Sequence, residues 1–325
     1  MSAAAGVEIE PNLVTIREAQ KFLAKYFAQT RLIEAPSLGR RTAKNAYLKL
    51  ETELPTGSFK VRGAFYALAQ RMKKETVREV IASSTGNHGA AVAYAAKEFG
   101  IAARIFLPAN CNPVKRERIL ALGAAMVESG GGDLASAFQL AAEYAKQPGV
   151  YFLNDATDQD LPAGPATIAC EILEQLPKVS AMVVPMGDTA LIRGIAAAAK
   201  QVAPHVRIIG VQAERAPAYY LSWKEGRVVG TETCDTIADG LATRTPEAAN
   251  VRDVRKLVDD VVLVSEEQML EAIASLLMEE HIVAEPAGAA STAALLKARE
   301  GYGDFPVLLV SGGNIPREVL KRALS

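Results

Sequence analysis

Short apolar runs alternate with longer alanine-rich segments along almost the whole chain. The runs are rich in β-branched residues, as strands are, and the segments between them space their apolar residues as helices do. The expected strands are 46–50, 80–84, 104–107, 150–153, 182–185, 207–211, 261–264 and 307–310. The expected helices are 63–71, 89–99, 113–122, 134–145, 164–176, 191–202, 266–279 and 287–299, preceded by an amphipathic helix over 16–29. Because the strands are apolar at nearly every position, this alternation predicts an α/β fold whose parallel sheets are buried between helices.

The size and charge of the chain limit its partners. A chain of 325 residues predicts two domains or one large α/β unit. The 36 basic and 37 acidic residues leave a net charge of −1, and no basic run marks a surface for nucleic acid or membrane. We therefore expect the partner to be a small molecule or a second copy of the chain.

The cysteines and the apolar runs indicate the cellular compartment of the protein. Cys111, Cys170 and Cys234 are widely spaced and odd in number, so we expect neither a disulfide framework nor a zinc ribbon. The first residues lack the basic and apolar regions of a signal peptide, and no apolar run approaches the ~18 residues of a membrane span. These features predict a cytoplasmic protein with reduced thiols.

Four loops between an expected strand and an expected helix carry most of the polar chemistry. In parallel sheets, ligands bind beyond the carboxyl ends of the strands, where these loops lie. The loop 55–60 ends on Lys60, whose amine could form a Schiff base with a cofactor and then act as a base. Alone, a lysine near a turn is more often a solvated surface charge.

The other three loops offer hydroxyls, amides and backbone N–H groups. Loop 83–89 reads Ser-Ser-Thr-Gly-Asn-His-Gly and loop 187–191 reads Gly-Asp-Thr-Ala-Leu, and each precedes a helix, whose N-terminus can bind an anion. Asp188 would repel a phosphate unless its side chain points away or Arg193 offsets it. Loop 311–314, Ser-Gly-Gly-Asn, offers the Ser311 hydroxyl to a ring nitrogen. Ordinary capped helix starts and glycine-rich turns are the alternatives.

In this order, the motifs TGSFK, TGNHG and SGGN resemble the serine/threonine dehydratase group of fold-type II (tryptophan synthase β-like) pyridoxal-phosphate (PLP) enzymes. The resemblance extends from the strand before Lys60 to the final SGGN. It implies two open, mostly parallel sheets flanked by helices, one in each domain. The large PLP-binding domain would comprise 1–74 and 155–325, and the small substrate-carboxylate domain 75–154. Relatives commonly form homodimers, which we expect here as well.

The resemblance also implies roles for individual residues. Lys60 would hold PLP as a Schiff base and act as the catalytic base, Asn87 would contact the phenolic oxygen, and Ser311 the pyridine nitrogen. The cofactor phosphate would bind at Gly187, Asp188, Thr189, Ala190 and Leu191. The cofactor ring would be surrounded by Phe59, Gly240 and Glu285. The substrate carboxylate would bind at Ser84, Thr85, Gly86, Asn87 and His88.

The activity that the resemblance implies is dehydration and deamination of a small β-hydroxy amino acid, such as threonine or serine, to a 2-oxo acid and ammonia. A neutral Ser311 hydroxyl would leave the pyridine nitrogen unprotonated and favour rapid elimination. The alternatives are a β-replacement lyase or synthase of the cysteine- or threonine-synthase kind, an amino-acid racemase, and a catalytically silent PLP-binding protein. The sequence leaves the substrate open.

Three stretches depart from the usual pattern of that group. Only Gly187 remains of a run of glycines at the phosphate loop, and 154–156 reads Asn-Asp-Ala in place of histidine, proline and an aromatic residue. Gln212 and Ala218 replace the carboxylates with which some relatives bind a divalent cation. Because a hard cation needs charged oxygen ligands, we expect no metal at this position.

Overall fold

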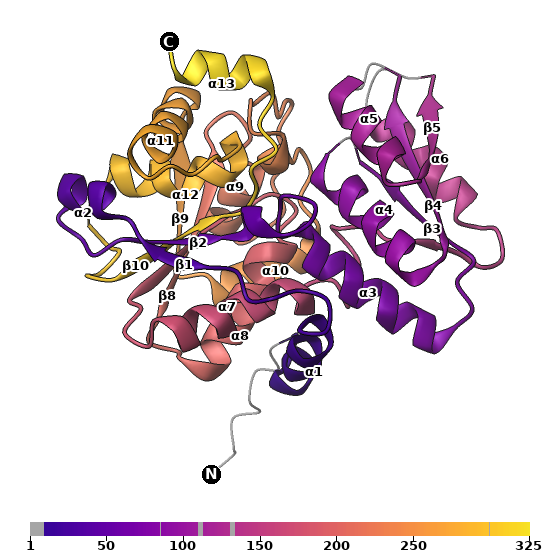
Figure 1. Cartoon of the computed structure of the whole chain (residues 1–325), viewed down its shortest axis with the longest axis horizontal. Coiled ribbons are helices and arrows are strands. Elements are labelled where there is room, and N and C mark those ends of the chain that lie inside the picture. The colour runs from indigo at the N-terminus through magenta and orange to yellow at the C-terminus, as the bar shows by residue number, and fades with distance from the viewer. Residues whose placement is uncertain (1–9, 85, 110–112, 131–133, 299) are drawn as a thin grey trace.

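Two separate sheets organise the chain (Figure 1). The computed structural model describes residues 10–325 except 85, 110–112, 131–133 and 299. The larger sheet has the order β1-β2-β10-β7-β8-β9, and its strands are β1 Leu32–Glu34, β2 Tyr47–Leu50, β10 Pro306–Val310, β7 Ala181–Pro185, β8 Arg207–Ala213 and β9 Asp260–Val264. The smaller sheet has the order β5-β4-β3-β6, and its strands are β5 Ala125–Ser129, β4 Ala102–Pro108, β3 Glu79–Ser83 and β6 Val150–Phe152. Apart from β1, which runs antiparallel to β2, the paired strands are parallel, so the predicted fold class is confirmed.

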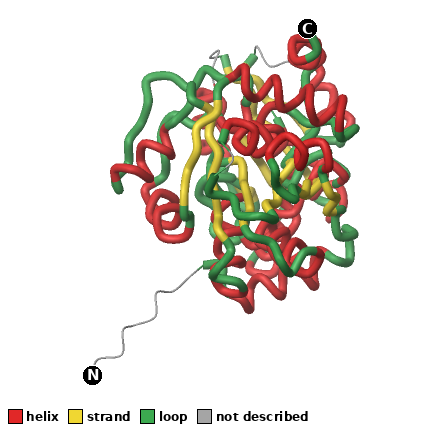
Figure 2. The backbone as a smooth tube through the Cα atoms, turned by 90° about the vertical axis from the view of Figure 1, so that its left-hand side faces the viewer, coloured by secondary structure: helices red, strands yellow, loops and turns green. Residues whose placement is uncertain are grey.

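Helices cover the faces of both sheets, as Figure 2 shows with strands in yellow between helices in red. The α-helices are α1 Leu13–Leu23, α2 Pro36–Thr42, α3 Lys60–Lys74, α4 Asn87–Phe99, α5 Pro113–Ala121, α6 Leu134–Tyr144, α7 Ala163–Gln175, α8 Ala190–Val202, α9 Ala218–Glu225, α10 Ala248–Leu257, α11 Glu266–Glu279, α12 Pro286–Lys297 and α13 Arg317–Ala323. Two short 3₁₀ helices are η1 Glu51–Glu53 and η2 Asp239–Leu241. With few exceptions these helices and strands alternate along the chain, as the sequence predicts.

The larger sheet is buried on both faces. Met182 and Val184 of β7 pack into a core with α7 and α8, whereas Ala181 and Val183 of the same strand pack into a second core with α11 and α12. Successive side chains of a strand point to opposite faces, so a strand between two helical layers must be apolar throughout. This explains the continuous apolar runs in the sequence.

The smaller sheet repeats this arrangement on a smaller scale. Val80 and Ala82 of β3 pack into a core that includes residues of α3 and α4, and Ile81 packs into another with Ala137 and Ala141 of α6. Its four strands lie between Glu79 and Phe152, on the right of Figure 1. On this basis we propose that 75–154 forms the small domain.

Most expected helices differ from those in the structure by one or two residues at an end, and two differ by three or more. The helix expected over 16–29 is α1, which begins at Leu13 after the cap residue Asn12 and ends at Leu23. The chain turns there because Phe27 packs its ring against Phe65 of α3, with ring centroids 4.8 Å apart. The helix expected over 63–71 begins three residues earlier, at Lys60, which places this lysine in the first turn of α3.

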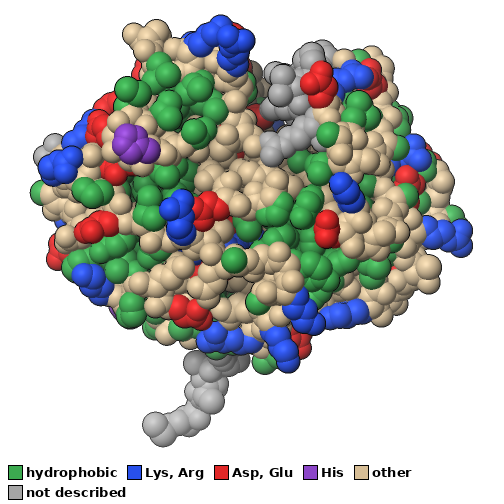
Figure 3. Space-filling view, viewed as in Figure 1, with side chains coloured by type: hydrophobic (Ala, Val, Ile, Leu, Met, Phe, Trp, Pro, Cys, Tyr) green, Lys and Arg blue, Asp and Glu red, His purple; other side chains and the backbone are tan. Residues whose placement is uncertain are grey.

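The surface shows no large region of one charge on the face drawn in Figure 3, where basic and acidic side chains are interspersed. Within the described ranges, no helix is both long enough and apolar enough to cross a membrane. The mixed charges of this face agree with the near-neutral net charge of the sequence.

Candidate functional site

One pocket gathers the residues that the sequence singles out. It lies between the two sheets, because residues that follow β3 and β6 of the smaller sheet line it together with residues that follow β2, β7 and β10 of the larger one. The predicted site residues that line it are Phe59, Lys60, Ser84, Gly86, Asn87, His88, Gly187, Asp188, Thr189, Ala190, Leu191, Gly240, Glu285 and Ser311. Thr85 lies outside the described residues. All four chemically interesting loops therefore meet at one place, at the carboxyl ends of parallel strands.

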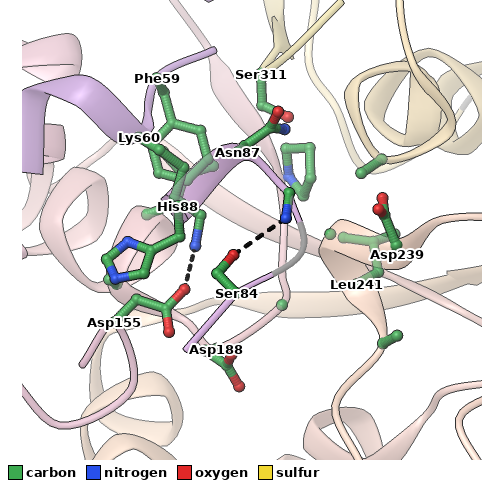
Figure 4. A pocket seen from close by; sticks show the side chains of 18 of the residues that line it. Phe59, Lys60, Ser84, Asn87, His88, Asp155, Asp188, Asp239, Leu241 and Ser311 are labelled. Carbon is green, nitrogen blue, oxygen red and sulfur yellow. Dashed lines mark hydrogen bonds and ion pairs between the residues drawn. The ribbon is translucent and has the colours of Figure 1, made fainter. Parts of the chain in front are cut away.

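Lys60 reaches into this pocket from the first turn of α3. Its Nζ lies 2.6 Å from Oδ2 of Asp155, and the two side chains point toward each other in Figure 4. Burial alone would lower the pKa of Lys60, but the Asp155 carboxylate outweighs burial and raises it. Burial likewise opposes the charge of Asp155, yet the Lys60 ammonium holds the pKa of that carboxyl below its usual range. The two groups therefore form an ion pair in the pocket.

The backbone ties the Lys60 loop to the end of β10. Phe59 donates its N–H to the carbonyl of Ser311 at 3.0 Å, and Ser58 forms an isolated antiparallel bridge with Gly312. Phe59 also places its ring near Lys60, with Nζ 5.6 Å from the ring centroid. These contacts fix Lys60 and Ser311 relative to each other, although they come from distant parts of the sequence.

A second polar cluster joins Asn87 to the loop after β10. Asn87 Nδ2 donates to Glu285 Oε1 at 2.6 Å, and Asn314 Nδ2 donates to Asn87 Oδ1 at 2.6 Å. A Cβ atom at Gly312 would lie 2.1 Å from Glu285 Oε1, so a glycine is required for the carboxylate to lie there. The second N–H of the Asn87 amide remains available for a ligand in the pocket.

The loop at the start of α4 presents several polar groups. Gly86 donates its N–H to Ser84 Oγ at 3.2 Å, and the helix begins at Asn87 with N–H groups that have no acceptor in the first turn. His88 Nε2 donates to the carbonyl of Leu153 at 2.8 Å, and burial lowers the pKa of its ring. In the described part of the chain, buried Ser83 Oγ and His88 Nδ1 lack hydrogen-bond partners, and both residues line the pocket. Unpaired polar atoms in a pocket point to a polar ligand.

The loop after β7 has the form of an anion site. Thr189 precedes α8 in a left-handed conformation with φ of 70°, so the free N–H groups of the first helical turn face the loop. A Cβ atom at Gly187 would lie 2.1 Å from the carbonyl oxygen of Gly240, so only glycine fits between these segments. Thr189 Oγ1 accepts a hydrogen bond from Arg193 Nε at 3.2 Å, and the same side chain hydrogen-bonds to the Tyr219 hydroxyl, which lies next to the loop.

Asp188 is the feature of this loop that does not favour an anion. Its Oδ1 accepts a hydrogen bond from Thr243 Oγ1 at 3.0 Å. Burial, together with repulsion from Asp155, raises the pKa of Asp188 to about 6. The carboxyl can therefore become neutral just below neutral pH, which lessens its repulsion of a phosphate. The loop fits a phosphate group. The ionised form of Asp188, which prevails at higher pH, would weaken the binding of that phosphate.

Some lining residues were missed by the sequence analysis. They are Ser83, Leu134, Asp155, Pro185, Asp239, Leu241, Ala242 and Ala287. Asp155 is the most consequential, and the available signal was that its stretch departs from the usual pattern just after an expected strand. Asp239 precedes Gly240 in η2, a segment without a strand or helix pattern.

The position where some relatives bind a cation is used for packing. Gln212 is fully buried in β8, and its Oε1 accepts the N–H of Tyr220 in α9 at 2.7 Å. Among the residues that the structure describes, no group of three or more histidine, cysteine or acidic side chains is arranged to hold a metal ion.

Comparisons with known proteins agree on the kind of protein that this chain resembles. The profile of the family described as "Pyridoxal-phosphate dependent enzyme" matches residues 23–313. The L-threonine ammonia-lyase of Thermotoga maritima is 37% identical over 313 residues, which cover 96% of this chain and 78% of that protein. The catabolic L-threonine dehydratase of Staphylococcus aureus is 35% identical, over 94% of this chain and 89% of that protein.

Solved structures of the same kind superpose closely on this one. A threonine deaminase from T.th. has a TM-score of 0.88 at 32% identity, covering 94% of this chain and 99% of that chain. Maize serine racemase has a TM-score of 0.90 at 29% identity, covering 96% of each chain.

Proposed function

Because the chain belongs to the pyridoxal-phosphate dependent enzyme family, we propose that it removes water and ammonia from a small β-hydroxy amino acid, such as threonine or serine, and releases a 2-oxo acid. The observation that carries this proposal is the place of Lys60, which lies in one pocket with the start of α8, whose free N–H groups suit an anion, and with the polar start of α4. The similarity to proteins named L-threonine ammonia-lyase and L-threonine dehydratase supports the same reaction.

The residues of the pocket fit the cofactor of the family. We propose that Lys60 binds its carbonyl carbon, that 187–191 holds its phosphate, that Ser311 meets its ring nitrogen and that Asn87 meets its phenolic oxygen. Phe59, Gly240 and Glu285 would surround the ring. The bound cofactor supplies an electron sink for the electrons of the Cα–H bond of the substrate.

The chain's own groups would then bind and deprotonate the substrate. The N–H groups at the start of α4, with Ser84, Gly86, Asn87 and His88, would hold its carboxylate, as a helix N-terminus does. Released from the cofactor, Lys60 would take the α-proton on Nζ, as a general base within hydrogen-bond reach. The Ser311 hydroxyl carries no charge, so it would not stabilise a protonated ring nitrogen as an aspartate would. This favours immediate elimination over a long-lived carbanion.

A product assay tests the proposed function. Purified protein loaded with PLP is incubated with L-threonine, L-serine, 3-hydroxyaspartate and phenylserine, and both the 2-oxo acid and ammonia are measured. We expect equimolar 2-oxo acid and ammonia from threonine or serine, and none from the Lys60→Ala variant. A product that forms only when an external nucleophile is added would show β-replacement, and D-amino acid without 2-oxo acid would show racemisation. Either result would refute the proposal.

We further propose that the protein works in the cytoplasm as a homodimer. Neither Cys170 nor Cys234 forms a disulfide, which agrees with a reducing compartment. The dimer is what the resemblance to fold-type II enzymes implies, and light scattering of the purified protein measures it directly.

A further inference from the structure

Asp155 adds a carboxyl group beside the lysine that would move the proton. It follows β6, in the stretch where the dehydratase group usually has histidine, proline and an aromatic residue. Its Oδ2 lies 2.6 Å from Lys60 Nζ, and both side chains are about one-fifth exposed, so both open onto the pocket. Apolar residues at this position would serve packing, whereas a carboxyl group can accept and donate protons.

Two other acidic side chains of the pocket, those of Asp188 and Glu285, have different partners. Asp188 accepts from Thr243, and Glu285 accepts from Asn87. Lys60 is also the only lysine or arginine among the residues found to line the pocket. A buried carboxylate is unfavourable unless it is paired, so the pairing of Asp155 with Lys60 is a specific arrangement rather than one ion pair among many.

The position of Asp155 brings it within reach of the substrate's leaving group. To take the α-proton, Lys60 Nζ must approach the α-carbon to within roughly 3–3.5 Å. Asp155, in contact with that nitrogen, then lies within roughly 6 Å of the α-carbon, and the leaving group is attached to the next carbon. Direct hydrogen bonding to the leaving oxygen, or contact through one water molecule, is possible at that range.

Given the proposed function, on which this inference rests, we propose that Asp155 is the general acid that protonates the leaving hydroxyl, with Lys60 as its proton source. Lys60, as a free amine, takes the α-proton, and the electron pair of the Cα–H bond becomes the second bond between Cα and Cβ. The Cβ–O bond breaks, and its electron pair leaves with the oxygen. As negative charge develops on the leaving oxygen, the proton of the Lys60 ammonium moves through the Asp155 carboxyl to that oxygen in a single relay, so Asp155 is not left protonated, and the oxygen departs as water. Lys60 is left as an amine and Asp155 as a carboxylate, so the cycle closes.

Two substrates with the same carbon skeleton separate this role from a merely structural one. L-Serine must lose hydroxide, which needs a proton, whereas β-chloro-L-alanine loses chloride, which needs none, and both give pyruvate. The proteins compared are the wild type, Asp155→Asn, Asp155→Glu and the control Asp160→Asn. Asp160 lies in the same loop, and its carboxylate pairs with Lys74 at the surface at 2.8 Å. Absorbance and fluorescence of the bound cofactor report loading, and NMR in D₂O reports exchange of the α-proton.

We expect Asp155→Asn to lower kcat/KM for serine by roughly 10²- to 10⁴-fold, the usual contribution of a general acid. Elimination of chloride and exchange of the α-proton should continue at nearly the wild-type rate. Asp155→Glu should recover part of the serine activity, and Asp160→Asn should behave as the wild type.

Three results would overturn the proposal. Equal losses for serine and β-chloroalanine, with loss of α-proton exchange, would mean that Asp155 only positions Lys60. Unchanged serine elimination would mean that another group supplies the proton. If Asp155→Asn does not retain the cofactor, Asp155→Glu decides: a loss confined to serine supports the proposal, and an equal loss for both substrates overturns it. A wild-type protein that releases neither chloride nor hydroxide would instead refute the proposed function.

Discussion

At the scale of single residues, the charge of Asp188 opposes the binding of a phosphate in this pocket. The carboxyl lies in the loop that starts α8, and its neighbours include the Asp155 carboxylate. Burial raises the pKa of Asp188 to about 6, so the group is mainly neutral below that pH and mainly ionised above it. A bound phosphate would disfavour the ionised form further.

Cofactor affinity should therefore depend on pH through Asp188. In Asp188→Asn the side chain stays neutral at every pH and can still accept from Thr243. We expect the two proteins to bind pyridoxine 5′-phosphate equally at about pH 5, and the variant to bind roughly tenfold more tightly at about pH 8, since one pKa unit of coupling is a factor of ten. This ligand lacks the aldehyde, so Lys60 cannot react with it. Fluorescence titration measures both affinities, and a ratio of one across the range would rule out a phosphate beside Asp188.

Residues differ in how far the sequence alone could place them. Lys60 and Ser311 could be singled out because each stands in a short loop at the end of an apolar strand and the order of these loops resembles that of fold-type II enzymes. Asp155 could not be predicted, because its role depends on an ion pair with Lys60, 95 positions away in the sequence. That pair forms only when the two sheets come together in the fold. The sequence showed only that its stretch departs from the usual pattern.

At the scale of elements, the pocket is built from helix N-termini. α3, α4 and α8 all begin at its edge, with Lys60, Asn87 and Ala190 as their first residues. Each start offers N–H groups without intrahelical acceptors, which suits a ligand with a phosphate and a carboxylate. Thr189, before α8, has a positive φ that a β-branched residue seldom adopts, so its hydroxyl should matter enough to offset the strain.

Replacing Thr189 by valine should weaken cofactor binding. Valine keeps the branched shape and the backbone strain but removes the hydroxyl. A hydrogen bond to a charged group contributes ~1.5–3 kcal/mol, so we expect PLP to bind roughly ten- to a hundredfold more weakly. Thr189→Ser, which keeps the hydroxyl, is the matched control and should bind nearly as the wild type does. Equal dissociation constants for the valine and serine variants would count against a phosphate at Thr189.

Elements at the edges were harder to predict than those at the centre. The central strands could be predicted because burial on both faces requires a continuous apolar run in the sequence. β5 was missed because it is an edge strand with only Ser129 fully buried, so its residues need not be apolar. β1 was missed because it has three residues and none of them is fully buried. Tertiary contacts, rather than local pattern, define such elements.

At the scale of the whole molecule, a buried charge network holds the helix of Lys60 against the larger sheet. Arg62, in the first turn of α3, pairs with Glu51 in η1 at 2.8 Å and with Glu171 in α7 at 2.5 Å. Glu171 also pairs with Lys49 of β2 at 2.6 Å, and the Lys49 side chain is fully buried. Removing one partner of a buried pair leaves an uncompensated charge, so this network resists local movement. It keeps α3 fixed to the larger sheet, while α4 reaches the pocket from the smaller one.

The meeting of the two sheets therefore creates the site, and Lys60 stands at the junction. The apolar strands predicted buried parallel sheets, the resemblance to fold-type II enzymes implied that there are two, and the loops at the strand ends predicted the shared site. It could not predict the distances across the pocket, because these depend on how helices pack between the sheets.

The most direct test of this account is to locate the cofactor on the chain. Protein loaded with PLP is reduced with borohydride, digested and analysed by mass spectrometry to find the modified lysine. We expect a stable pyridoxyl group on Lys60, and an absorbance band of the bound cofactor that the Lys60→Ala variant lacks. A pyridoxyl group on another lysine, or a Lys60→Ala protein that still forms a reducible adduct, would contradict the account.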